Sequence, residues 1–114
     1  MKLYKLNAHS TAISPGSYVL VLADDMNTIA ATRALSDLVD TARSHGLSAR
    51  DLGLKRTAFA LLNIAIDLDS ARTQLVQEGE SYLDAAWAFA DAGRRMVADY
   101  VAVIDRELID RARA

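Results

Sequence analysis

The sequence predicts a mainly α protein, a three-helix antiparallel bundle with a short N-terminal β-strand or hairpin. Alanine, which has the highest helix propensity, occurs 21 times in the 114 residues. Only five glycines and one proline interrupt the chain. Apolar residues recur at helical spacing over two long stretches, which indicates amphipathic helices. The length fits a single helical domain, 1–114, with helices expected at 25–45, 48–79 and 81–112.

The C-terminal helix, expected at 81–112, is the clearest element. At about 100° per residue, its apolar residues fall on one stripe and its charged residues fall largely opposite. Ser81 and Asp84 have the spacing of a capping box, and Gly79 precedes them as a break. The stripe predicted to face the core consists of Tyr82, Ala86, Phe89, Gly93, Met96, Val97, Tyr100, Ile104 and Leu108.

The helix expected at 48–79 is predicted to be the central one. Ser48 and Asp51 have the spacing of a cap, and Gly79 is expected to end the helix. Between Ala58 and Leu68 it is apolar nearly all round, which is typical of a helix contacted on several sides. A thin polar stripe is left, either a solvated edge or the wall of a pocket. It consists of Arg56, Asn63, Asp67, Ser70 and Gln74.

The N-terminal segment, 1–23, is predicted to contain a strand at 17–23, because "YVLVLA" is rich in β-branched and aromatic residues and follows the turn signal "SPGS". This strand would pair with part of 2–13 in a hairpin. Asp24 and Asp25 would then cap the helix at 25–45, and His45–Gly46 would end it. The competing interpretation is one longer, buried helix from Pro15, because short apolar runs are ambiguous. The face expected to pack in the 25–45 helix comprises Ala31, Leu35, Leu38, Val39 and Ala42.

Composition indicates a soluble cytoplasmic protein. The chain has no cysteine, which excludes disulfides, thiolate metal sites and a cysteine nucleophile and fits a reducing compartment. The stretch "MKLYKLNAHS" lacks an apolar run of signal-peptide length, so export by that route is not expected. The longest apolar runs are far shorter than the roughly 20 residues that span a bilayer, so no membrane partner is expected.

The polar residues give little support for catalysis, and no catalytic residue, metal ligand or cofactor is predicted. His9 and Ser10 are adjacent only in sequence, whereas nucleophilic sites are assembled in space. Asp67 and Asp69 diverge by about 200° on a helix and cannot chelate one ion together. The glycines are isolated, so no phosphate-binding loop is present. An enzyme stays a minor hypothesis, as a small ligand-binding or catalytic bundle. Its pocket would be lined by Arg56, Asn63, Asp67 and Gln74.

The segment "TARSHGLSARDLGLKRTAFALLN" resembles a helix-turn-helix unit, with Gly46 at the turn between two helices. The phrase "LGLKRTAFALLN" is similar to the recognition helices of bacterial regulators. Residues 43–56 hold four bases and one acid, a net charge of +3 that leaves −5 for the rest of the chain. The overall acidity opposes nucleic-acid binding, and the alternative is a helical corner with solvated bases. The resemblance implies that DNA is faced by Ser48, Arg50, Lys55 and Arg56.

Trp87, the only tryptophan, lies about 120° or more from the centre of the predicted core stripe. Because tryptophan is enriched at interface hot spots, a partner-binding seam is predicted on this side of the C-terminal helix. Self-association is its simplest form, since identical seams match across a two-fold axis. Alternatively, the N-terminal residues or the loop near Gly79 cover Trp87 within the monomer. The seam consists of Trp87, Asp91, Arg94, Ala98, Ala102 and Ile109.

The function predicted from these patterns is that of a small non-enzymatic protein-interaction module. Adaptors, immunity proteins and phage inhibitors are proteins of this kind, and a homodimer through the Trp87 side is one form of it. The first alternative is a helix-turn-helix DNA-binding regulator that uses residues 42–56. The second is the ligand-binding or catalytic bundle described above.

Overall fold

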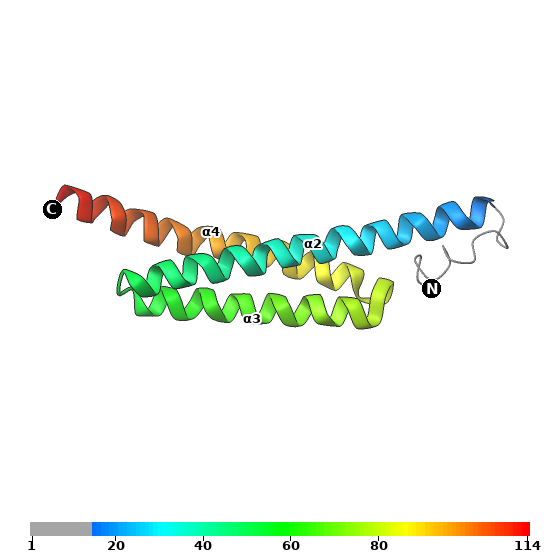
Figure 1. Cartoon of the computed structure of the whole chain (residues 1–114), viewed down its shortest axis with the longest axis horizontal. Coiled ribbons are helices and arrows are strands. Elements are labelled where there is room, and N and C mark those ends of the chain that lie inside the picture. The colour runs from blue at the N-terminus through cyan, green and yellow to red at the C-terminus, as the bar shows by residue number, and fades with distance from the viewer. Residues whose placement is uncertain (1–14) are drawn as a thin grey trace.

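The computed structural model describes residues 15–114, with side chains from residue 27 onward. This part of the chain is almost entirely helical, which confirms the mainly α class (Figure 1). Three long helices are joined by short connections, with one 3₁₀ turn between the second and third. Their bounds are α2 Pro15–Asp51, α3 Lys55–Glu78, η2 Gly79–Tyr82 and α4 Leu83–Arg113.

The helices form an elongated rod rather than a sphere. α3 runs back antiparallel to α2, and α4 returns along both of them (Figure 1). The first turns of α2 and the last turns of α4 extend past the other helices at opposite ends. The molecule measures 68 × 21 × 20 Å with a radius of gyration of 18.8 Å, against roughly 13 Å for a globular domain of this length. Each helix is therefore covered on part of its circumference only.

The core is narrow and built from small side chains. Between residues 27 and 114, eight of its sixteen buried apolar residues are alanine, and none is aromatic. At two points glycine allows helices to approach closely. A Cβ on Gly46 would lie 2.9 Å from Cγ of Leu62, and one on Gly93 would lie 2.8 Å from Cδ2 of Leu68. The absence of a side chain at these two glycines leaves room for the leucines that face them.

The strand predicted at 17–23 is wrong, because these residues belong to α2 and no strand occurs between residues 15 and 114. The competing interpretation, a helix that begins at Pro15, is correct in its start. Proline suits the first position of a helix because its missing N–H has no intrahelical partner there. Asp24 and Asp25 lie inside α2 and are not caps. The hairpin partner at 2–13 lies outside the described residues.

The helix end predicted at His45–Gly46 is also wrong, because α2 continues to Asp51. The chain turns instead at Gly53, whose φ is +80°. The Gly53 N–H donates to the Arg50 carbonyl at 2.9 Å, and the Leu54 N–H donates to the Ala49 carbonyl at 2.9 Å. This is the Schellman arrangement that ends many helices. α3 consequently begins at Lys55 instead of 48, and the cap predicted from residues 48 and 51 is not formed.

The turn between α3 and α4 agrees better with the prediction from the sequence. Gly79, with φ +65°, ends α3 as expected, and its N–H donates to the Leu75 carbonyl. The predicted capping box is wrong, however. The Ser81 hydroxyl donates to the Glu78 carbonyl at 3.1 Å, and no side chain caps α4. η2 therefore carries the chain from α3 into α4.

Gly53 provides a test of the α2–α3 turn. A Cβ there meets nothing within 4 Å, so the cost of a side chain comes from its positive φ alone. We expect Gly53→Ala to lower the free energy of unfolding by about 1 to 2 kcal/mol, and Gly53→Asn by less, because asparagine adopts left-handed backbone more readily. Urea unfolding of both variants measures this. Equal stability of wild type and Gly53→Ala would contradict the turn.

Candidate functional site

One side of α4 carries a row of large apolar side chains that the bundle leaves uncovered. Phe89, Met96 and Val103 are spaced by seven residues, so they lie along one face. They keep 44%, 47% and 47% of their surface exposed. Ala85, which precedes Phe89, and Ala92, which lies between Phe89 and Met96, fall at nearly the same helical angle. We call these five residues, Ala85, Phe89, Ala92, Met96 and Val103, the apolar row.

Phe89, Met96 and Leu108 were expected in the core, and the structure shows that this prediction is wrong. The residues of α4 that are buried are Ala86, Ala90, Gly93, Val97 and Ile104. The alanines and Gly93 face the neighbouring helices, and larger side chains on the flanks of this stripe stay exposed. Phe89 and Met96 lie at the edge of this stripe beside α3, and Leu108 lies in the last turns of α4.

A hollow of about 150 Å³ lies between α3 and α4 next to the apolar row. Its walls include Phe89 and Met96, and Asp67 is the only charged residue that lines it. A second, more open apolar hollow is lined by α4 alone and shares Phe89 and Ala92 with the first. Together with the apolar row we call this surface the α3–α4 groove. Besides the row, its lining residues are Ile64, Asp67, Leu68, Ala88 and Gly93.

Three charged side chains at the edges of the groove have no bonding partner among the described residues. Asp67, Arg95 and Asp99 make no ion pair or side-chain hydrogen bond among the described residues, and all three are exposed. Elsewhere on α4, Arg94 pairs with Asp91 at 3.0 Å. The side chains at the edges of the groove are therefore free to pair with another molecule.

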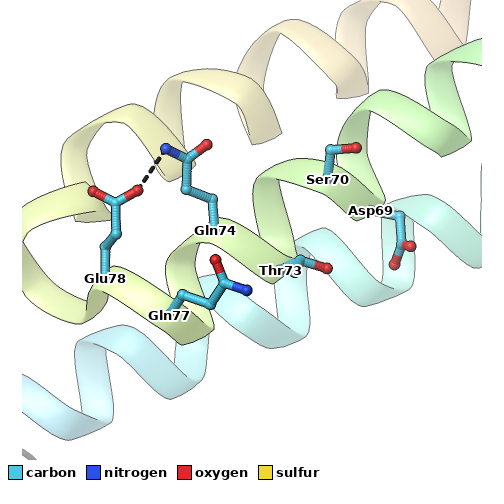
Figure 2. Close-up of a pocket in the computed structure, with 6 residues that line it drawn as sticks. All are labelled: Asp69, Ser70, Thr73, Gln74, Gln77 and Glu78. Atoms are coloured by element: carbon cyan, nitrogen blue, oxygen red, sulfur yellow. Dashed lines mark hydrogen bonds between the residues drawn. The ribbon is translucent and has the colours of Figure 1, made fainter.

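The predicted polar pocket is divided in the structure. Asp67 lines the α3–α4 groove, whereas Gln74 lines a separate polar depression of about 330 Å³. Neither Arg56 nor Asn63 lines either one. All six residues of the polar depression come from the last turns of α3 (Figure 2), where the Gln74 amide donates to Glu78 at 2.5 Å. A surface made by one helix does not enclose a ligand.

The residues predicted to face DNA lie at the turn between α2 and α3. Ser48 and Arg50 are exposed near the end of α2, and Lys55 and Arg56 are exposed at the start of α3. Gly46 is inside α2, so the implied position of the turn is wrong. The two helices lie side by side and antiparallel (Figure 1), whereas the helices of a helix-turn-helix unit meet at about 90–120°. The DNA-binding arrangement that the resemblance implied is therefore not formed.

Trp87 lies on the opposite flank of α4 from the apolar row, about 180° from Met96. It keeps 36% of its surface exposed, less than Phe89 or Met96. The rest of the predicted seam is exposed, but Asp91 and Arg94 pair with each other. The apolar row was not predicted from the sequence, although the seven-residue spacing of Phe89, Met96 and Val103 is a signal for it.

No family model, curated protein or solved structure matches this chain. The described residues hold no group of three or more potential metal ligands among His, Cys, Asp and Glu. Within the same part of the chain, no helix combines the length and apolarity needed to cross a bilayer. The α3–α4 groove combines exposed large apolar side chains with a hollow.

Proposed function

We propose that this protein is a non-enzymatic helical module that binds another protein through the α3–α4 groove, in the manner of a cytoplasmic adaptor, inhibitor or immunity protein. One observation carries the proposal. Three large apolar side chains, Phe89, Met96 and Val103, line up along one face while each keeps more than two-fifths of its surface exposed. Contact with a partner would remove this area from water, which is worth about 25 cal/mol per Å².

The shape and chemistry of the groove fit a helix better than a small molecule. Its lining is almost entirely carbon, and Asp67 is its only ionisable group. No nucleophile or general base stands beside that carboxylate, so the surface offers recognition without chemistry. Anchors spaced by seven residues match the repeat of a packed helix, which is a common mode of recognition.

Site-specific photo-crosslinking in the native cells tests the proposal. Ala92, which lines both hollows, is replaced by the photoreactive amino acid p-benzoylphenylalanine. The control carries the same group at Ile66, which is 61% exposed on α3 and lines neither hollow. We expect a protein adduct from position 92 and none from position 66. No adduct at 92, or equal adducts at both, would overturn the proposal.

A matched pair of charge insertions measures the contribution of the groove. Met96→Asp should weaken partner binding by at least about 2 kcal/mol, the usual size of a hot spot, because it places a carboxylate at the centre of the apolar row. Phe59→Asp introduces the same charge at another exposed apolar residue, on α3, and should leave binding nearly unchanged. Trp87→Ala tests the opposite flank of α4 in the same assay. Calorimetry on the captured partner gives all three values, and a larger loss for Trp87→Ala would place the contact on the predicted seam instead.

A further inference from the structure

Resting on the proposed function, we infer that the groove binds a second copy of this chain, whose α4 packs antiparallel to the first across a two-fold axis close to Met96. A two-fold interface uses the same surface on both copies, so that surface must be complementary to itself. The apolar row, the outer edge of α4 and the facing edge of α3 each meet this condition.

The apolar row matches itself about Met96. In an antiparallel pair, residues equally far along the helix on either side of the axis come opposite one another. Phe89 and Val103 are each seven residues from Met96, so Phe89 faces Val103 of the partner subunit. Val103 of the partner subunit then reaches the hollow beside Phe89 and Ala92. Met96 meets the partner's Met96 at the axis.

The outer edge of α4 carries a basic and an acidic residue, placed so that each can meet the opposite charge on an antiparallel second copy. Arg95 and Asp99 lie on the same side of the apolar row and are unpaired among the described residues. Same-side residues meet across an antiparallel contact. With the axis close to Met96, Arg95 lies within about two residues, or 3 Å along the helix, of the partner's Asp99. The pair occurs twice, once on each side of the axis. A parallel arrangement would leave Asp99 without a cation.

The edge of α3 shows the same symmetry. Leu68 lies against Gly93, and α3 runs antiparallel to α4, so residue 65 is about level with Met96. Asn63 and Asp67 stand at equal distances on either side of that level. An antiparallel second copy therefore brings the Asn63 amide, as donor, opposite the carboxylate of the partner's Asp67.

The available area predicts a weak dimer. From Phe89 to Val103, the part of the row that is symmetric about Met96, the row spans about 21 Å at 1.5 Å per residue, and a face two helices wide is roughly 20 Å across. This gives roughly 400 Å² per copy and about 800 Å² in total, which is in the range of weak and transient interfaces. We expect reversible dimerisation with a dissociation constant in the micromolar range.

Charge reversal with rescue tests the orientation. Sedimentation equilibrium from about 1 to 500 µM protein, at about 50 mM salt to limit screening, gives the dissociation constant. We expect Arg95→Asp and Asp99→Arg each to weaken the dimer at least about 5-fold, and the double variant to return to within about 2-fold of wild type. Arg94→Asp, on the other flank and paired with Asp91, is the control and should change little. Circular dichroism confirms that each variant is folded.

A single-cysteine variant tests the axis. The chain has no cysteine, so Met96→Cys introduces one thiol, which would lie beside its symmetry mate. Thiol–disulfide exchange with oxidised glutathione, which is reduced to two molecules of glutathione, would then give a disulfide-linked dimer. Ile66→Cys, exposed on α3, should stay monomeric. Wild-type protein that is monomeric at about 500 µM, or a double charge variant as weak as the single ones, overturns this inference. If the Ala92 crosslink then captures a different protein, only the second copy is wrong; if it captures none, the proposed function falls as well.

Discussion

Leu61→Ala is expected to lower the free energy of unfolding by about 3 to 5 kcal/mol, because the lost side chain leaves a cavity that its neighbours fill only in part. Leu61 is fully buried on α3, and a Cβ on Gly46 would lie only 3.4 Å from its own Cβ. α2 and α3 lie close together at this site, so the backbone has little room to collapse. Urea unfolding, read at protein concentrations low enough to keep the chain monomeric, gives the value.

Ile66→Ala is the matched control for this measurement. It removes an aliphatic side chain of the same size from the same helix, five residues further on, but Ile66 is mostly exposed. A surface substitution of this kind usually changes stability by no more than about 0.5 kcal/mol. Similar losses for Leu61→Ala and Ile66→Ala would mean that α3 does not present the face toward α2 that the structure describes.

Gly93→Leu should be the most damaging substitution on α4, with a loss of about 3 kcal/mol or more. A Cβ alone at this position would lie 2.8 Å from Cδ2 and 3.1 Å from Cδ1 of Leu68, which is itself buried. A whole leucine side chain must therefore push α4 away from α3. For Gly93→Ala we expect a smaller change, because the better helix propensity of alanine, about 1 kcal/mol, offsets part of the crowding.

A double-mutant cycle isolates this contact. Leu68→Ala costs stability by itself, but in the Gly93→Leu background it makes room for the new side chain. The two changes together should then cost less than the sum of their separate costs, by up to about 3 kcal/mol. Urea unfolding of the four proteins provides the cycle, and simple additivity would show that Leu68 and Gly93 do not touch.

The helical class and the second turn follow from the sequence alone. Abundant alanine and few breaking residues favour helix wherever the chain packs, since these preferences act locally. Gly79 was recognised as a helix end because it interrupts two apolar patterns, and the structure gives it the positive φ that glycine tolerates best.

The first turn depended on tertiary packing. Gly46 and Gly53 are both glycines followed by leucine, and local sequence favoured Gly46. In the structure Gly46 lies inside α2, where its missing side chain leaves room for Leu62, and Gly53 takes the positive φ. Local sequence also does not determine the secondary structure of residues 17–23, since a short apolar stretch suits either a strand or a helix.

In the candidate site, too, some features follow from the sequence and others depend on tertiary packing. The sequence by itself determined that α4 is amphipathic, and that Phe89, Met96 and Val103 share one of its faces. Only the tertiary structure decided that this face stays outside the core. The physical reason is the arrangement of the helices: α4 packs against α2 and α3 through Ala86, Ala90, Gly93, Val97 and Ile104, and none of the described elements covers the flank that carries Met96. Which part of an amphipathic face is buried depends on where the neighbouring helices lie, and helical periodicity alone does not specify it.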